Sequence, residues 1–581
     1  MATVADGAER GLVTKDTPMS SALEIARGAT LRPIHDIAAQ MGIREEFLEP
    51  YGRHVAKVRL EAIDALASRP RAKYVVVTAI TPTPLGEGKT TTTLGLAQGF
   101  HHIGRHAVAA IRQSSMGPTF GIKGGAAGGG YSQAAPFEPI NLHLTGDMHA
   151  VSAAHNQLAA MIDNHLFHGN SLGLDLDSIT WRRCLDVNDR ALRNIVIGLG
   201  TGQDGIPRQS GFDITAASEV MAILALSTSL SDMRERMGRI IVGFTRHGHP
   251  VTAQDLRAAG AMAVIMRDAI KPNLVQTLEG TPVLIHAGPF GNIAHGNSSI
   301  IADQLGIHAG EFLITEAGFG ADMGAERFFN IKCRVSKLVP DVAVIVATVR
   351  ALKAHSGVHR IVAGRALPPA LFEENPDEVL VGGANLRKQI ENVQRHGVTV
   401  VVAINSFAQD HASEHAAIAS IASSMNVRCA VTEHFTRGGA GAVELAQAVA
   451  EAANEPSHYA PLYPLEMPLR EKIEIIAREI YGADGIDLSA PAKKRLELFE
   501  RAGLTGAMVC IAKTHLSISS DPTLKGAPTG WRMPVREIRA SAGAGFIYAI
   551  SGDMRTMPGL SIHPAAESID LDSDGNVVGL Y

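Results

Sequence analysis

The segment that most constrains the fold is the strand-forming run YVVVTAI (74–80), which leads directly into TPTPLGEGKTTTT (81–93). Near-continuous Val and Ile predict a strand buried on both faces, and the residues from Lys89 onward predict a helix. A strand, a glycine turn and a helix in this order form a phosphate cradle, because backbone N–H groups and the helix dipole point at the anion. The turn therefore predicts a nucleoside triphosphate site; the alternative is an ordinary glycine turn before a buried helix.

Individual roles in this turn follow from the residue types. Lys89 can reach the terminal phosphates, and the Thr90 hydroxyl is placed to ligate Mg²⁺. Gly86 and Gly88 allow backbone conformations that a side chain would obstruct. The usual pattern GxxxxGK[ST] is incomplete, because Thr83 stands where its first glycine is expected. The expected ATP-binding residues are Thr83, Pro84, Leu85, Gly86, Glu87, Gly88, Lys89, Thr90 and Thr91.

Short runs rich in Val, Ile and Ala recur along the whole chain and predict further strands. They are HAVAAI (106–111), NIVIGL (194–199), RIIVGF (239–244), PVLIH (282–286), EFLITE (311–316), VAVIVAT (342–348), VTVVVAIN (398–405) and AMVCIA (507–512). Most lack polar alternation, as strands of a parallel sheet do, and helical patterns between them supply the crossovers. The sequence thus predicts an α/β fold: a P-loop-containing, mostly parallel sheet core with additional α/β domains.

The domain organisation is less sharply marked. We expect a nucleotide-binding region over residues 1–375, with an inserted α/β subdomain, and a C-terminal α/β region over 376–581 that contributes to a second substrate site. The first seventy residues read mostly as helix. The most proline-rich segment, PSHYAPLYPLEMP (456–468), is a candidate connection into the C-terminal region.

Composition excludes several classes of protein. The chain has 581 residues, 46% hydrophobic and 19% charged, and a net charge of −5, so no strong field points to nucleic acid or an anionic membrane. No apolar run approaches the ~18 residues of a membrane span, and the start lacks a signal-peptide core. The four cysteines have no CxxC spacing, which argues against a zinc site or a disulfide framework. We therefore expect a cytoplasmic protein.

A second set of candidate residues follows the strand at 106–111. Arg112 would lie at its carboxyl end, next to the phosphate cradle if the two strands are neighbours, and could grip a carboxylate or phosphate bidentately. GIKGGAAGGGY (121–131) then places Lys123, Gly124 and Gly125 in a dense glycine segment. Beside a phosphate site, such a segment indicates backbone that approaches a ligand closely. Alternatives are a solvated arginine and a flexible linker, and His295 is a weaker candidate.

The long motifs identify a family. GIKGGAAGGGY is identical to a signature of formate–tetrahydrofolate ligase (10-formyltetrahydrofolate synthetase), and VATVRALKAHSG (346–357) differs from its second signature only at Ser356. Further segments resemble the family from about residue 30 to the end, among them TPTPLGEGKTTTT, NLHLTGDMHA, HAGPFGNIAHG, TEAGFGADMGAERFFNIKC and GAPTGWRMPVREIRASAGAGF.

The resemblance implies an ATP-dependent ligase of one-carbon metabolism. In the family, formate attacks the γ-phosphate of ATP, and N10 of tetrahydrofolate takes the formyl group from the resulting formyl phosphate. Arg112 matches the arginine that binds formyl phosphate, so Arg112 and Lys89 are the expected catalytic residues. Phe407 and Phe435 match two aromatics that stack on the pterin. The family also implies Mg²⁺, stimulation by K⁺ or NH₄⁺, and a homotetramer.

Five positions depart from the family pattern. After Arg112, Gln113 and Ser114 replace a glutamate and a proline; elsewhere Ser406 replaces a lysine, Ser356 a glycine and Phe435 a tryptophan. Loss of the glutamate changes charge and hydrogen bonding around the expected formate pocket. These departures leave two alternatives to the formate ligase. One is a paralogue that uses another small carboxylate or acceptor, and the other is a P-loop regulatory ATPase.

Overall fold

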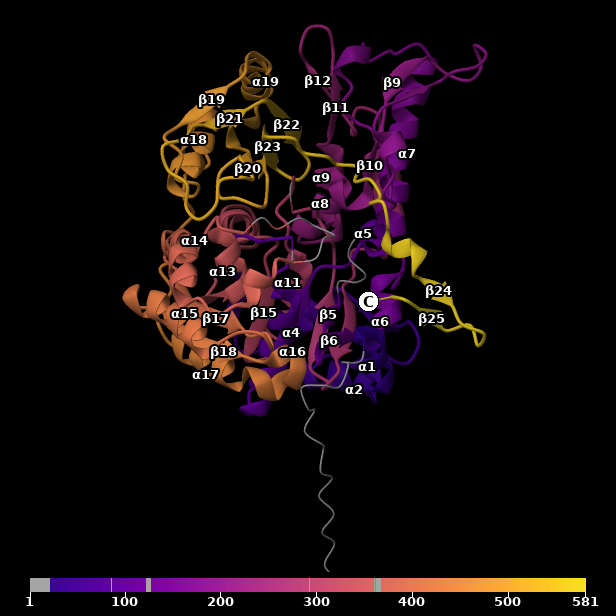
Figure 1. Ribbon diagram of the computed structural model, residues 1–581. Helices are drawn as coiled ribbons and strands as arrows, with labels where there is room; N and C mark the ends of the chain where they lie inside the picture. Colours follow the sequence, from indigo (N-terminus) through magenta and orange to yellow (C-terminus); the bar gives the residue numbers. More distant parts are fainter. Residues whose placement is uncertain are drawn as a thin grey trace, which may run out of the picture.

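The computed structural model describes residues 21–84, 86–121, 127–291, 293–359, 361 and 367–580. Its centre is a 12-stranded mixed sheet (Figure 1). Seven neighbouring strands are parallel and run in the order β14-β4-β15-β3-β16-β17-β18. Their bounds are β3 Lys73–Ala79, β4 Ala107–Ile111, β14 Pro282–Ile285, β15 Phe312–Glu316, β16 Val342–Ala347, β17 Thr399–Asn405 and β18 Arg428–Thr432.

Alternate residues of the parallel strands enter two separate cores, which explains the absence of polar positions in their sequences. Tyr74 and Val76 of β3 face one core, and Val75 and Val77 face the other. Helices cover both faces, as a parallel sheet requires. The first core includes residues of α14 (Pro376–Gln394) and α15 (Ala412–Ser424); the second includes residues of α4 (Lys89–His102) and α17 (Val443–Ala452). The predicted α/β class with a mostly parallel sheet is confirmed.

Antiparallel strands extend this sheet on the β14 side. β13 (Asn273–Thr277) pairs with β14, and also with β2 (Ala56–Val58) and β6 (Ser132–Ala135). The N-terminal region supplies β1 (Leu48–Pro50) and β2 besides its three helices. The expectation of mostly helix there therefore missed two short strands. The helices are α1 Ala22–Gly28, α2 Ile34–Gln40 and α3 Glu61–Leu66.

The chain between β6 and β13 forms a separate layer with its own hydrophobic core. Its helices are α7 Asp147–Phe167, α8 Glu219–Leu226, α9 Leu230–Gly238 and α10 Ala259–Ile265, and its short strands are β7 Arg183–Leu185, β8 Ile195–Ile197, β9 Arg208–Ser210, β10 Phe212–Ile214, β11 Ile241–Phe244 and β12 Pro250–Thr252. NIVIGL and RIIVGF do form strands, but in two antiparallel hairpins and not in the parallel sheet. Val196 is 54% exposed, so the apolar sequence pattern predicted a buried strand at a position where the strand is exposed.

The C-terminal part packs above the central sheet in Figure 1. The segment 456–468 joins α17 to α18 without regular structure, as expected for a connection. Beyond it, β20 and β23 pair in parallel and β22 pairs antiparallel with β23. The bounds are α18 Leu469–Glu479, α19 Ala490–Arg501, β20 Met508–Lys513, β22 Glu537–Ser541 and β23 Phe546–Ser551.

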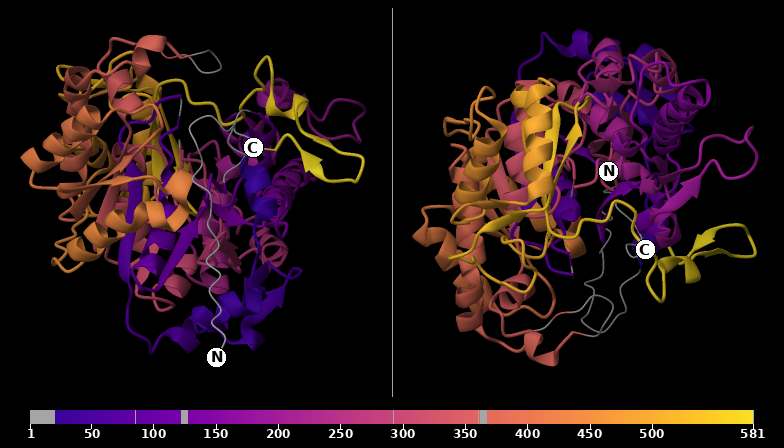
Figure 2. Two further views of the ribbon diagram at one scale, coloured as in Figure 1. Left: turned by 60° about the horizontal axis from the view of Figure 1, so that its bottom comes forward. Right: turned by 90° about the horizontal axis from the view of Figure 1, so that it is seen from above.

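The end of the chain returns to its beginning. After β23 it crosses the molecule to the β24–β25 hairpin (Asp570–Leu571 and Val577–Val578), a course visible from three directions in Figures 1 and 2. Arg27 donates a hydrogen bond to the carbonyl oxygen of Val577, and Leu580 is buried in one core of the central sheet. β16 and β17, which flank the expected domain boundary at 375/376, are neighbours in that sheet, and the boundary stays a prediction. No helix within the described ranges is long and apolar enough to cross a bilayer.

Candidate active site

The glycine turn between β3 and α4 has the geometry of an anion cradle. Gly88 caps the N-terminus of α4 in the left-handed conformation (φ 73°) and, having no side chain, provides no capping hydrogen bond of its own. A Cβ on Gly88 would lie 2.7 Å from the side-chain nitrogen of Asn405, so both its conformation and its surroundings require glycine. Gly86 also has a positive φ, of 74°. Helix α4 begins at Lys89, as the sequence predicts.

Glu87 holds this turn in place from within. Its side chain is 1% exposed, and Oε1 accepts hydrogen bonds from the backbone nitrogen and the hydroxyl of Thr83 at 2.8 and 3.1 Å. Oε2 accepts a 3.0 Å bond from Thr348, which follows β16. Thr83 and Glu87 thus fix the loop and the neighbouring strand, and Leu85 lies outside the described residues.

Glu316, the last residue of β15, connects the turn to Arg112. The Thr90 hydroxyl donates a 2.5 Å hydrogen bond to Oε2 of Glu316, and Nε of Arg112 lies 3.3 Å from Oε1. Burial alone would raise the pKa of the Glu316 carboxyl, but the charge of Arg112 and the hydrogen bond from Thr90 outweigh it and hold this pKa below its ordinary value. A buried, ionised carboxylate therefore stands between the two predicted site residues.

The route from Arg112 to the turn differs from the expected one. β4 is not beside β3, because β15 lies between them. The carboxyl ends of all three strands meet at one edge of the sheet, where α/β proteins bind ligands. Glu316 bridges the intervening strand and brings Arg112 within reach of the turn. No pattern in the sequence singled out Glu316; the available signal was its position as the last residue of a buried strand.

The glycine-rich segment meets the same edge of the sheet. Lys123, Gly124 and Gly125 lie outside the described residues. At the described end of the segment, a Cβ on Gly129 would lie 3.1 Å from the ring of Phe435, and the backbone nitrogen of Tyr131 donates a 2.8 Å bond to the Phe435 carbonyl. Close approach of backbone to Phe435 accounts for glycine at this position.

The two predicted aromatic residues follow adjacent strands. β17 and β18 pair in parallel, with Asn405 opposite Thr432, so Phe407 and Phe435 both lie beyond their carboxyl ends. The guanidinium of Arg350 lies 3.6 Å from the centroid of the Phe407 ring and covers one of its faces. Phe435 is 38% exposed. An apolar ring with exposed area at a sheet edge is suited to stacking on a flat ligand.

His434, which sequence reasoning missed, fixes the backbone next to Phe435. It is fully buried, and its ring nitrogens lie 2.7 Å from the Thr432 hydroxyl and 3.2 Å from the Thr92 hydroxyl of α4. Burial lowers the pKa of His434 to about 4, so the ring is neutral at physiological pH. It therefore joins the loop after β18 to the helix that follows the phosphate cradle.

The positions that depart from the family pattern have distinct surroundings. Gln113 is 5% exposed; its backbone nitrogen donates to the Ala287 carbonyl, and its side-chain oxygen has no partner among the described residues. Ser406 donates from its backbone to Thr432. Ser356, the residue after α13 (Val349–His355), donates a hydrogen bond from its hydroxyl to Glu378. His295 is completely buried, with neither ring nitrogen bonded to a described residue.

Comparison with known proteins decides what this arrangement belongs to. A profile of the family described as formate–tetrahydrofolate ligase matches residues 20–581. The chain belongs to the formate–tetrahydrofolate ligase family. It is 67% identical over 573 residues to formate–tetrahydrofolate ligase 3 of Rubrobacter xylanophilus, covering 97% of this chain and 100% of that protein. The corresponding enzyme of Saccharopolyspora erythraea is 66% identical (96% and 99% covered), and that of Cutibacterium acnes 61% (97% and 100%). Membership of the ligase family is thus established over nearly the whole chain, and the resemblance seen in the sequence is confirmed.

Proposed function

We propose that this chain joins formate to N10 of tetrahydrofolate at the expense of ATP, through formyl phosphate. The observation that supports this most directly is the line of contacts from Thr90 through Glu316 to Arg112. It places a cation for a small anion beside a turn suited to nucleotide phosphates, at the carboxyl edge of the sheet.

ATP would bind with its phosphates at the N-terminus of α4. The turn residues offer backbone N–H groups, and Lys89 neutralises charge on the terminal phosphates. The donors present fit Mg²⁺, which prefers oxygen ligands and retains several waters. Thr90 would hold the ion with Glu316 as an outer partner, and when bound the ion would neutralise charge on the transferred phosphoryl group.

Arg112 would act on both halves of the reaction. A formate oxygen attacks the γ-phosphorus, and the bond from that phosphorus to the ADP oxygen breaks. The guanidinium can hold the oxygens of formate and then of formyl phosphate bidentately. N10 next attacks the formyl carbon, the carbon–oxygen bond to phosphate breaks, and N10 loses its proton as inorganic phosphate leaves. Glu316 contacts Nε of Arg112 and would hold the guanidinium oriented toward these anions.

Tetrahydrofolate would bind beyond the ends of β17 and β18. Two ring faces are available for the pterin. Phe407 is covered on its other face by Arg350, and Phe435 lies against Gly129 and next to the buried His434. Lys123, Gly124 and Gly125, which we assign to the phosphate or the intermediate, belong to the glycine-rich segment that runs up to Phe435. The segment would thus contact both substrates.

Family membership alone supports three further proposals: a homotetramer, stimulation by K⁺ or NH₄⁺, and a cytoplasmic location. The alternative carboxylate or acceptor remains a second candidate because the Gln113 side-chain oxygen is buried without a partner among the described residues. A pocket adapted to another carboxylate would have to supply a hydrogen-bond donor to this oxygen.

The deciding experiment measures ADP release by the purified chain with Mg-ATP and tetrahydrofolate, with and without formate, together with the product's mass. Formate-dependent ADP matched by 10-formyltetrahydrofolate is the expected result. ADP release that ignores formate would favour a regulatory ATPase, and release with another carboxylate would favour the paralogue. Lys89→Ala should abolish turnover without changing the thermal unfolding curve, and full activity in this variant would contradict the phosphate cradle.

A further inference from the structure

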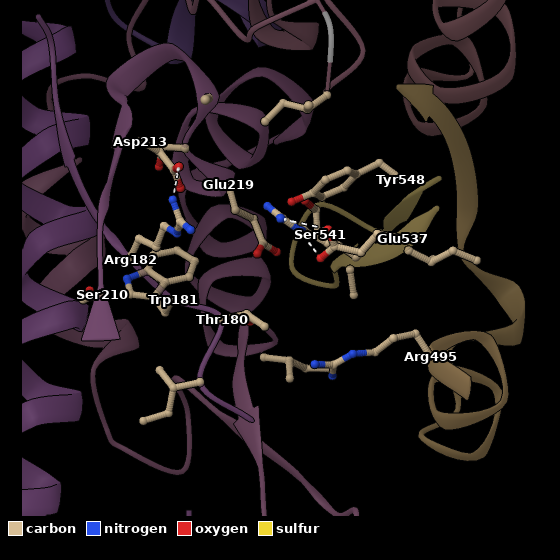
Figure 3. A pocket seen from close by; sticks show the side chains of 18 of the residues that line it. Thr180, Trp181, Arg182, Ser210, Asp213, Glu219, Arg495, Glu537, Ser541 and Tyr548 are labelled. Carbon is tan, nitrogen blue, oxygen red and sulfur yellow. Dashed lines mark hydrogen bonds and ion pairs between the residues drawn. The ribbon is translucent and has the colours of Figure 1, made fainter. Parts of the chain in front are cut away.

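A cavity of about 480 Å³ lies far along the chain from the glycine turn, between the inserted layer and the C-terminal sheet (Figure 3). One wall comes from segments 176–182 and 207–213 and the start of α8, and the other from β22, β23 and α19. The volume is within the usual range of small-molecule sites, roughly 300–1,000 Å³. None of the residues assigned above to ATP, formate or tetrahydrofolate lines it.

Glu219, the first residue of α8, presents a carboxyl group to this cavity (Figure 3). Its Oε1 accepts hydrogen bonds from the backbone nitrogens of Gly543 and Ala544, at 2.7 and 3.4 Å. Burial raises the pKa of Glu219 to about 8. Near neutral pH the group is therefore largely protonated, so its O–H can serve as a donor.

Arg495 supplies an unpaired cation on the opposite wall. It projects from α19 toward the inserted layer in Figure 3, and it makes no hydrogen bond or ion pair with any residue that the structure describes. Arg539 donates to both oxygens of Glu537, at 2.6 and 3.0 Å, and Arg182 lies 3.9 Å from Asp213. The carboxylate of Asp177, at an exposed position of the lining, pairs with no cation that the structure describes. The Ser210 hydroxyl, buried in the same lining, also lacks a partner within the described ranges.

These donors need an acceptor. Buried polar groups are nearly always hydrogen-bonded, and a charge facing a partly enclosed cavity is stabilised by a counter-charge. A guanidinium and a carboxylic acid O–H that face one cavity from opposite walls can both bind the oxygens of a carboxylate or phosphate (Figure 3). A cationic ligand is less favoured, because Arg539 and Arg182 pair with Glu537 and Asp213, and of the ionised carboxylates only that of the exposed Asp177 lacks a cation among the described residues.

The rest of the lining is suited to a flat apolar body. Trp181 is 7% exposed and stacks on His155, with 4.1 Å between ring centroids and 20° between planes. Tyr548 faces the same space from β23 (Figure 3). Aromatic walls with a few placed polar groups are the usual composition of small-molecule sites.

We propose that this cavity binds a small organic anion whose carboxylate or phosphate group pairs with Arg495 and whose flat ring lies along Trp181. Glu219 donates a further hydrogen bond to the anion, and the Ser210 hydroxyl is left as a donor on the wall of the inserted layer. The site is separate from the ligase centre and takes a different ligand.

Trp181 provides the reporter for a test. The chain has two tryptophans, Trp181 and Trp531, and only Trp181 lines the cavity, so Trp531→Phe leaves a single emitter there. Benzoate and phenyl phosphate are the probes, and benzamide and benzyl alcohol are their neutral counterparts. We expect saturable change in fluorescence with at least one anion and binding at least 10-fold weaker with its neutral counterpart. Tighter binding of benzoate would assign a carboxylate ligand, and tighter binding of phenyl phosphate a phosphate.

Arg495→Gln in the same background should weaken binding of the anion at least 10-fold. Lys494→Gln removes an exposed cation one position away on α19 and should leave binding unchanged. Thermal unfolding and formate-dependent ADP release establish that both variants are folded. The proposal fails if neither anion saturates the signal, if the neutral compounds bind equally well, or if Arg495→Gln binds as tightly as Lys494→Gln.

Discussion

The Thr90 hydroxyl donates a 2.5 Å hydrogen bond to Oε2 of Glu316, across two neighbouring parallel strands. Thr90 belongs to the helix that follows β3, and Glu316 ends β15. A carboxylate on the strand beside the proposed phosphate-binding turn is well placed to orient both Thr90, the proposed metal ligand, and Arg112. This pair therefore determines the orientation of the side chains in the candidate site before substrates bind.

Glu316→Gln should lower kcat/KM for formate about 100-fold, equivalent to ~2.7 kcal/mol of transition-state stabilisation. The amide keeps the shape but loses the charge that orients Arg112. Initial rates of formate-dependent ADP release measure the effect. Glu311→Gln, at a partly exposed position just before the same strand where Glu311 pairs with Arg105, is the control and should retain full activity. Wild-type rates in Glu316→Gln would remove this carboxylate from the site.

Arg112→Ala should cost at least ~2 kcal/mol in kcat/KM, because a charged intermediate loses its counter-ion. Arg112→Lys should recover only part of this loss, since an ammonium group cannot bind two oxygens in the guanidinium geometry. Arg105→Ala, at an exposed arginine of the same chain segment, serves as the control. A loss below threefold in Arg112→Ala would make Arg112 an ordinary solvated arginine.

Phe435→Ala should raise the KM for tetrahydrofolate by about tenfold while changing the KM for ATP little, because loss of one stacking face costs ~1.4 kcal/mol. Phe435→Trp should lower the KM for tetrahydrofolate, since it enlarges that face. Phe167→Ala is a matched control, with 37% exposure against 38% for Phe435. Equal changes in both KM values would argue against stacking.

Buried histidines should make the fold sensitive to acid. Burial lowers the pKa of His434 to about 4, so below its ordinary value of about 6.5 the unfolded chain binds a proton that the folded chain refuses. The contribution of His434 to stability is thus complete above pH 6.5 and is lost as the pH falls toward 4, at about 1.4 kcal/mol per pH unit. His155, His286, His355 and His396 have the same burial-lowered pKa of about 4 and add to the effect.

Denaturant unfolding between pH 7 and 4 measures this slope. His434→Gln keeps a polar group between Thr432 and Thr92. It should reduce the slope of the unfolding free energy by about one proton, that is by about 1.4 kcal/mol per pH unit, whatever its effect on stability at pH 7. His563→Gln, at a side chain 85% exposed, should not alter it. An unchanged slope in His434→Gln would mean that this ring accepts a proton in the folded state.

The sequence predicted the elements of the site better than their arrangement. The strand at 74–80, the turn and the start of α4 at Lys89 follow from local patterns of 3–15 residues, and all were found where expected. Glu316 could not be found this way, because its role depends on β15 lying between β3 and β4. The Arg350–Phe407 contact likewise joins the helix after β16 to the loop after β17, and only the folded sheet brings these two segments together. NIVIGL shows the opposite error, since hydrophobic pattern alone did not reveal an exposed hairpin.

Gln113→Glu tests whether the pocket is adapted to formate. The side-chain oxygen of Gln113 is buried without a partner among the described residues, directly after Arg112. A carboxylate there would compete with formate and with Glu316 for the guanidinium, and its burial costs free energy unless Arg112 pairs with it. We therefore expect formate turnover no higher than in the native chain and a raised KM for formate. Gln113→Met, which is neutral and similar in length, separates the effect of charge from that of packing. A large gain in formate turnover for Gln113→Glu alone would show that the native pocket has moved away from formate toward another carboxylate.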